Sequence, residues 1–494
     1  MYRKSQNPDS PDEAFELPFE GQLCAENRWV VLASLIPWSE FEEEYAQNFS
    51  EEMGAPAKPF RMALGALIIK EKLGISDRET VEQIKENPYL QYFIGEKSYQ
   101  NKAPFDASMM VHFRQRIGLT LIQGINQKIV QQGRGFQEEV VSPKKSEEAE
   151  RKKENRGKLL IDATVSPADI KYPTDVDLLN QARKITESVI DVLYKSLKGK
   201  LIQKPRTHRK LARKEYLKFA KKKKTSRKER RNAVKKQLQY LKRNFGHIER
   251  LLEEGASLEG LSRAEYRKLL VSSEITRQQQ WLWSHNENRV ENRIVSLTQP
   301  HLRPIVRGKA GSPTEFGAKL SVSCVEGYVL LERISWDNYN ESGDLISQVE
   351  AYKDYTGVYP ESLHADRIYR TRANRAWCKE RGIRLSGPPL GRPPKKSSRT
   401  AKKQAQEDER IRNEIEGKFG QAKRRFSLNR VMAKLPNTSE TSIAMTFLVM
   451  NLVKLLRQFY CPFLCQLFQN LIIFSKTINL NYDVNDLSEV GVIF

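Results

Sequence analysis

The sequence predicts an α/β core, a mixed sheet with flanking helices, preceded by an all-helical segment. Strand-like alternation begins at Lys158 and returns after Pro304, while the first 135 residues and a long basic stretch between the strands have helical periodicity. A chain of 494 residues can form two or three domains. We therefore expect a helical domain at 1–135, a linker at 136–157, the α/β core at 158–475 with a basic helical insertion at about 177–298, and a peripheral tail at 476–494.

Charge and cysteine content narrow the possible partners and compartment. The formal net charge is +23, which favours a polyanionic partner, above all nucleic acid. The five cysteines are scattered and odd in number, as in proteins of a reducing cytoplasm. The uncharged run from Ser442 to Val453 is too short to span a bilayer and predicts a buried helix. The N-terminus is not a signal or transit peptide, so we expect a cytoplasmic protein that does not enter a membrane.

The helical N-terminal segment resembles a helix-turn-helix arrangement. A helix with the sequence RMALGALIIKEKL stops at Gly74, and Ser76 with Glu79 forms a capping box for the next helix. A later helix, SMMVHFRQRI, carries Arg114 and Arg116. These observations predict that the segment reads DNA, with Arg114 and Arg116 as contacts; the alternative is an ordinary helical bundle.

The expected insertion combines dense positive charge with an apolar row. Lys200 to Arg231 contains sixteen Lys or Arg, against two Glu. This density predicts contact with the phosphate backbone, and the alternative is a solvated surface. An apolar row then follows helical spacings of 4 and 3, which predicts either a seam between two protomers or packing inside the insertion. The DNA-binding candidates are Lys221, Lys222, Lys223 and Lys224, and the row is Val234, Leu238, Leu241, Phe245, Ile248 and Leu252.

Carboxylates mark two strand segments of the expected core and one of its helices. Asp162 interrupts the buried-strand pattern KLLIDATV, and Asp366 ends the strand ESLHADR. A carboxylate there is costly unless it lies at a strand end, is hydrogen-bonded or holds a metal. The helix at 408–425 has a second row beside its apolar stripe, with Glu416 in that row and Glu414 on the opposite flank. Helix geometry alone leaves the choice between Glu414 and Glu416 open. The stripe comprises Ile411, Ile415, Phe419, Ala422 and Phe426, and the second row Arg412, Glu416 and Lys423.

The order of these elements points to phosphoryl transfer. From Lys158 it runs strand with Asp, helical insertion, two strands, helix, strand with Asp, helix, strand, helix with Glu. Two carboxylates at adjacent strand ends and a third on a helix packed across them can hold two divalent ions. Hard oxygen ligands select Mg²⁺ or Mn²⁺, and such a pair stabilises both oxygens of an in-line displacement. This is the catalytic arrangement of the RNase H-like fold.

The chain resembles the DDE transposases of bacterial insertion sequences, in particular the group with a Y-(2)-R-(3)-E-(6)-K pattern on the catalytic helix. The R, E and K positions match at Arg412, Glu416 and Lys423, whereas Glu409 replaces the tyrosine. The segments IDATV, RGKAGSPTEFGAKL, SWDNYNE and HADRIYRTRANRAWC also resemble that group. The resemblance implies a catalytic and metal-binding triad of Asp162, Asp366 and Glu416, with Arg412 and Lys423 against the transposon-end DNA.

The implied activity is metal-dependent hydrolysis at transposon ends, followed by strand transfer of the 3′-OH into target DNA. It implies double-stranded DNA as partner, a homodimer assembled on that DNA, and a nucleoid-associated protein in the bacterial cytoplasm. Two alternatives are a stand-alone metal-dependent nuclease on the same fold and a non-catalytic DNA-binding protein. A simple nuclease needs neither the basic insertion nor the helical N-terminal segment. A non-catalytic descendant would be indicated by loss of a carboxylate, and all three are present.

Overall fold

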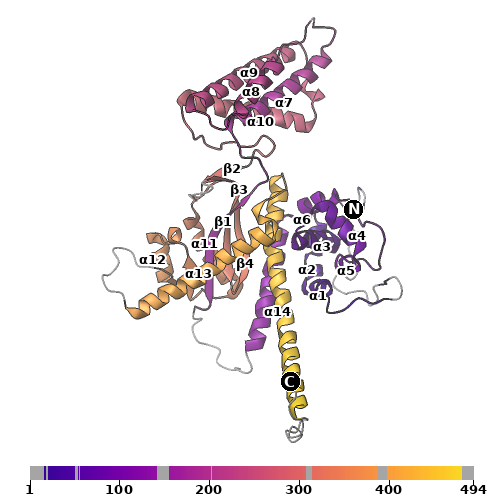
Figure 1. The fold of residues 1–494 in the computed structure, drawn as a ribbon, viewed down its shortest axis with the longest axis vertical. Coiled ribbons are helices and arrows are strands. Elements are labelled where there is room, and N and C mark those ends of the chain that lie inside the picture. The colour runs from indigo at the N-terminus through magenta and orange to yellow at the C-terminus, as the bar shows by residue number, and fades with distance from the viewer. Residues whose placement is uncertain are drawn as a thin grey trace, which may run out of the picture.

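The computed structural model describes residues 16–17, 21–50, 54, 56–141, 155–201, 203–306, 314–387 and 398–480. It has an α/β architecture in which a six-stranded mixed sheet lies between helical layers (Figure 1). A separate helical bundle projects from one end of the sheet, and a long C-terminal helix runs past its face. The predicted α/β class with flanking helices is therefore confirmed.

Strand β1 is central in the sheet. It pairs antiparallel with β3 on one side and parallel with β5 on the other, and β6 continues the parallel part. Strand β3 also pairs with β2 and β4. Glu326 and Gly327 form the predicted turn between β3 and β4, with positive φ angles of 51° and 77°. The strands are β1 (Lys158–Pro167), β2 (Arg303–Val306), β3 (Thr314–Val325), β4 (Tyr328–Ser335), β5 (Ser362–Ala365) and β6 (Arg384–Leu385).

Each face of the sheet has its own apolar core, because successive side chains of a strand point to opposite faces. Leu160 of β1 packs in one cluster with residues of α13 and α14. Leu159 and Ile161 pack on the other face, with residues of α11 and α12. This explains why Leu159, Leu160 and Ile161 are all apolar. The helices are α11 (Leu345–Thr356), α12 (Arg372–Glu380), α13 (Arg399–Arg425) and α14 (Pro436–Leu480).

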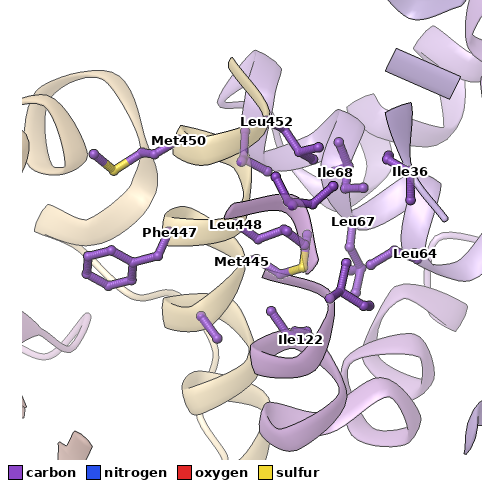
Figure 2. Packing of buried hydrophobic residues seen from close by; sticks show 14 of the residues in the cluster. Ile36, Leu64, Leu67, Ile68, Ile122, Met445, Phe447, Leu448, Met450 and Leu452 are labelled. Atoms are coloured by element: carbon purple, nitrogen blue, oxygen red, sulfur yellow. The ribbon is translucent and has the colours of Figure 1, made fainter. Parts of the chain in front are cut away.

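The N-terminal helices share a core with the sheet. Figure 2 shows Leu64, Leu67 and Ile68 of α3 beside Ile122 of α6 and Leu448 of α14. The expected boundary at residue 135 falls inside α6, and most of the expected linker, 142–154, lies outside the described residues. The helices are α1 (Arg28–Leu35), α2 (Trp38–Ala46), α3 (Phe60–Leu73), α4 (Asp77–Glu86), α5 (Pro88–Phe93) and α6 (Met109–Val141).

Helices α3 and α4 end and begin where the sequence predicts. Gly74 closes α3 with a left-handed φ of 69°, which costs glycine little. The Ser76 side chain accepts a hydrogen bond from the Glu79 N–H at 3.1 Å and so caps α4. The short turn between the helices is therefore fixed at both ends.

The uncharged run in α14 is a core helix. The residues from Ile443 to Val453 are buried, as predicted, and α14 packs against α6. The helix is longer than the run itself. The segment Pro436–Tyr460 is long and apolar enough to cross a membrane, but 83% of its most apolar window is buried inside the protein. Residues 481–494, most of the expected tail, lie outside the described part of the chain.

Four helices between β1 and β2 form the projecting bundle. The apolar row of α9 packs inside it, with Leu241 fully buried against residues of α7 and α10. The row therefore packs within the bundle, so the alternative that it forms an interface between two protomers is wrong. Ser226 with Glu229 and Ser262 with Glu265 form capping boxes at α9 and α10. The helices are α7 (Asp175–Ser196), α8 (Arg209–Ala220), α9 (Arg227–Glu253) and α10 (Arg263–His285).

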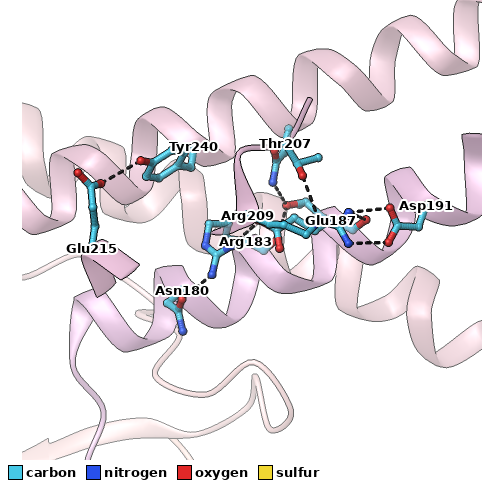
Figure 3. Close-up of polar contacts among 10 residues, drawn as sticks. Asn180, Arg183, Glu187, Asp191, Thr207, Arg209, Glu215 and Tyr240 are labelled. Carbon is cyan, nitrogen blue, oxygen red and sulfur yellow. Dashed lines mark hydrogen bonds and ion pairs between the residues drawn. The ribbon is translucent and has the colours of Figure 1, made fainter. Parts of the chain in front are cut away.

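Polar contacts stabilise α7 internally and tie it to the start of α8 (Figure 3). Arg183 of α7, only 1% exposed, donates hydrogen bonds to Glu187 and, at 2.8 Å, to the Asn180 Oδ1. Arg209 at the start of α8 pairs with both carboxylate oxygens of Asp191, at 2.9 and 2.6 Å. A buried charge is tolerated only when it is paired in this way.

Candidate active site

Asp162 lies in β1 and Asp366 directly follows β5, the adjacent parallel strand. Ile161 of β1 is paired with Ala365 of β5 in a parallel register, so the two aspartates directly follow a matched pair. Because the parallel pairing ends at Ile161 and Ala365, both aspartates lie at the same end of the paired segment. Neighbouring strands are about 4.8 Å apart, so the two residues are close to each other. Asp162 is half-buried and Asp366 is exposed.

The pKa of Asp162 is raised to about 6, mainly because burial disfavours the charged form. The negative charges of Asp366 and Glu341 raise it further. A hydrogen bond accepted from the Ala163 N–H at 2.7 Å and the charge of Arg412 act in the opposite direction. The site therefore brings carboxylates together without enough positive charge to balance them, which suits a divalent cation.

Helix α13 crosses the sheet above β1 and β5. Its predicted apolar stripe is present: Ile415, Phe419 and Ala422 are buried against the sheet-facing core. Arg412 of the neighbouring row acts electrostatically on Asp162, which indicates that Arg412 lies on the side of α13 toward the aspartates. Arg412 donates a hydrogen bond to the Glu416 Oε1 at 2.8 Å, and Glu416 is 53% exposed.

Glu414 lies on the other flank of α13, near the turn between β3 and β4. A side-chain carbon added at Gly327 would lie 3.2 Å from the Glu414 Oε1 and 3.4 Å from the Lys418 Nζ. Glu414 is thus grouped with Lys418, and Glu416 with Arg412. Glu409, which replaces the tyrosine of the family pattern, accepts a hydrogen bond from Arg412 at 2.7 Å and so helps to hold it.

The three proposed metal ligands do not form one compact cluster in this conformation. Among the described residues, no group of three or more His, Cys, Asp or Glu side chains is arranged to hold a metal ion. The sheet brings Asp162 and Asp366 together, whereas Glu416 forms an ion pair with Arg412 on α13. The oxygen-only donor set matches the preference of Mg²⁺ and Mn²⁺.

Two charged residues at the site were not singled out from the sequence. Glu341 acts on Asp162 and forms an ion pair with Lys319 at 2.6 Å. Arg370 lies near Asp366, and its guanidinium packs against Gly387, where any side chain would collide with it. Both belong to segments, SWDNYNE and HADRIYRTRANRAWC, that carry the family resemblance described above. The charged residues of those segments are the sequence signal that indicates Glu341 and Arg370.

His364 is a local hydrogen-bonding residue. Its side chain is fully buried, with the Nε2 3.1 Å from the Ser362 Oγ and the Nδ1 3.8 Å from the Asp408 Oδ1. It therefore contacts α13 at Asp408.

The proposed DNA contacts of the N-terminal segment are engaged elsewhere. Arg114 is only 7% exposed and donates to the Asp77 Oδ2 at 3.0 Å, so it ties α6 to α4. This corrects its assignment as a DNA contact, because a guanidinium buried in an ion pair is not available to bases or phosphates. Arg116 is half-buried, and its guanidinium lies 4.5 Å from the centre of the Phe49 ring.

The other proposed contacts are more accessible. Lys221, Lys222, Lys223 and Lys224 are all exposed between α8 and α9, and Lys222 pairs with Glu229. Lys423 is half-buried on α13, seven residues beyond Glu416. The basic turn therefore presents a compact positive surface at the bundle.

Comparison with known families agrees with this picture. Residues 363–453, which include β5, Asp366, α13 and Glu416, match the model of a transposase DDE domain. Residues 18–116 match the model of a transposase domain (DUF772). One curated relative is "Uncharacterized protein ORF8 in nfe locus" from Rhizobium meliloti, 31% identical over 180 residues, which cover 36% of this chain and 81% of that protein. No solved structure matches this chain. The chain is a DDE transposase of the insertion-sequence type.

Proposed function

We propose that this transposase hydrolyses the phosphodiester bond at the ends of its element and transfers the resulting 3′-OH into target DNA. The observation that supports this best is the adjacency of Asp162 and Asp366 on parallel strands beneath α13. In the sheet order β4-β3-β1-β5-β6, only β3 runs antiparallel to β1, and this arrangement is consistent with an RNase H-like core. Activity on DNA follows from the family; the bond chemistry is our proposal.

Asp162, Asp366 and Glu416 are the residues that would hold two Mg²⁺ or Mn²⁺ ions. Their fit rests on the oxygen donors and on the raised pKa of Asp162, which is due mainly to burial and further to the negative charges of Asp366 and Glu341. When bound, two such ions stabilise the charge on the attacking and leaving oxygens of an in-line displacement.

The surrounding residues position this donor set. Arg412 orients Glu416 through the 2.8 Å hydrogen bond and presents positive charge beside Asp162. Lys319 holds Glu341 near the site. Arg412 and Lys423 are assigned to the phosphates of the end DNA. The buried wall around Asp162 limits access of water to one side of the site.

We further propose that two protomers act on paired ends as a homodimer, because one site can hold only one reacting strand end at a time. The charge of +23 opposes association until phosphates neutralise it. Since the α9 row packs inside its own bundle, the interface is formed by other surfaces. We assign the protein to the bacterial cytoplasm and nucleoid, with α14 as a core helix rather than a membrane span.

The test uses matched substitutions on the two flanks of α13. Glu416→Ala is expected to abolish Mg²⁺-dependent cleavage of a duplex that carries the element's end, whereas Glu414→Ala retains cleavage. Asp162→Ala and Asp366→Ala behave like Glu416→Ala, and all four variants still bind the duplex, because the basic surfaces remain. Normal cleavage by Glu416→Ala together with loss in Glu414→Ala would overturn the assignment of the third carboxylate.

A further inference from the structure

A groove of about 920 Å³ lies between the N-terminal helices and the end of α13. Its walls are the turn between α3 and α4, the first turn of α6, the last turn of α13, the segment 427–435 and the start of α14. The groove therefore joins the helix-turn-helix-like segment to the helix that carries Glu416. None of the functions assigned above uses it.

The acidic residues of the groove form hydrogen bonds or ion pairs with residues of its walls. Glu71 of α3, 4% exposed, accepts hydrogen bonds from the Ser427 N–H at 3.0 Å and from the Thr446 Oγ1 at 2.6 Å. Asp77 is paired with Arg114. These contacts also fix α3 against Ser427 and α14, and α4 against α6. The two carboxylates of the groove, Glu71 and Asp77, therefore have partners in its walls.

The cations along the groove remain available. Arg78, Arg424, Arg425 and Lys434 line it and are exposed, and within the described ranges none of them forms an ion pair with a carboxylate. Arg78 lies in the first turn of α4, where unpaired backbone N–H groups add to the attraction for anions. Lys434 also lines a second hollow at the base of the α7–α10 bundle, together with Lys171 and Gln181. Positive charge therefore continues from α4, past α13, to Lys434, whereas Asp169 and Asp177 line the second hollow beside Lys171.

We propose that this groove holds the sugar–phosphate backbone of duplex DNA on one flank of the bond that is cleaved. The inference rests on the proposed function for the position of that bond, and on charge complementarity for the ligand. Eight residues of helix separate Glu416 from Arg424, which corresponds to about 12 Å along α13. A duplex advances about 3.4 Å per base pair, so the groove meets the backbone roughly three or four base pairs from the reacting phosphate.

The experiment compares two double variants on the same helix. Arg424→Ala with Arg425→Ala removes two groove cations, and Lys402→Ala with Lys403→Ala removes two exposed cations at the other end of α13. Binding of a fluorescent duplex that carries the element's end is measured without divalent metal, between about 50 and 200 mM salt. All four side chains are exposed, although the Arg425 guanidinium also lies over the Phe426 ring. Thermal melting checks that each variant is folded.

The groove variant is expected to bind roughly tenfold or more weakly and to lose about 2 from the slope of log affinity against log salt. The Lys402 and Lys403 variant is expected to bind like the wild type. Two shortened duplexes, each ending about two base pairs from the cleaved bond on one side, locate the contact. On one of them the difference between the groove variant and the wild type disappears.

Equal losses in the two double variants would overturn the proposal, as would a difference that persists on both shortened duplexes. Unchanged DNA binding with reduced binding of a poly-glutamate peptide would assign the groove to an acidic protein partner instead. Because the readout is binding without metal, it is independent of cleavage. If the carboxylate variants cleave normally, the proposed chemistry fails, whatever the groove binds.

Discussion

Replacing Asp162 by Asn is expected to stabilise the metal-free protein above about pH 6 while abolishing cleavage. Its pKa of about 6 in the folded state lies above the ordinary value of 3.8, so the folded state binds this proton more tightly than the unfolded state. The penalty for charging Asp162 is therefore absent at low pH. It develops as the pH rises from about 4 to about 6 and is complete above that range.

The magnitude follows from the same two values. The difference between 3.8 and about 6 corresponds to about 3 kcal/mol of unfolding free energy at neutral pH. Asparagine preserves the side-chain oxygen that accepts the Ala163 N–H, so the substitution removes charge with little change of shape. This figure is an upper bound, because Asp162 keeps some contact with water.

Thermal unfolding in the presence of a chelator, at about pH 4 and about pH 8, measures the effect. The Asn variant is expected to melt a few degrees above the wild type at the higher pH and together with it at the lower pH. Mg²⁺ should then raise the melting temperature of the wild type more than that of the variant, because a ligand of the ion has been lost. Asp354→Asn, which alters an exposed aspartate of α11, is the matched control and should show no pH-dependent difference. Equal melting of Asp162→Asn and wild type at pH 8 without metal would refute the reasoning.

Other predictions concern the bundle and the assembly. Neutralising Lys221 to Lys224 should weaken binding to end and random duplexes alike and lower the salt slope by up to about 4; selective loss of end binding would contradict a backbone role. Glu187→Ala should cost about 3–5 kcal/mol by leaving Arg183 buried and unpaired, as measured by unfolding, whereas Glu259→Ala at an exposed position should cost little. Light scattering should detect a dimer on end DNA and a monomer without it; an active complex of one protomer with two ends would exclude the dimer.

The sheet and its helices could be predicted because their signals are local. Alternation around Glu326 and Gly327 specifies a hairpin, and the spacing from Ile411 to Phe426 specifies one buried helix face. Asp366 comes directly after β5, as its predicted place at the end of the strand ESLHADR indicated. Chain order then brought Asp162 and Asp366 together, since a parallel crossover is needed to return beside β1.

The packing of the N-terminal segment could not be predicted in the same way. The apolar faces of α3 and α6 look alike whether they close a separate domain or cover another layer. The partner that covers them, α14, lies more than 300 residues further along the chain. Glu71 could not be predicted as buried for the same reason. Its hydrogen-bond donors, Ser427 and Thr446, are distant in the chain, and nothing near Glu71 in the sequence indicates that this carboxylate is buried.

Arg114 and the apolar row of α9 show why a residue pattern alone does not decide whether a surface is free. An arginine on a helix after a helix-turn-helix pattern is equally compatible with DNA contact and with an ion pair, and Asp77 lies 37 residues away. The α9 row likewise fits a dimer seam or a bundle core, and the apolar faces of α7 and α10 decide for the core. In both cases the partner was present in the chain at long range.

Positive charge is different, because a cation that finds no carboxylate within the fold keeps its attraction for phosphate. For that reason the unpaired arginines at the end of α13 support DNA binding more strongly than Arg114 does, although Arg114 lies in the better-known pattern.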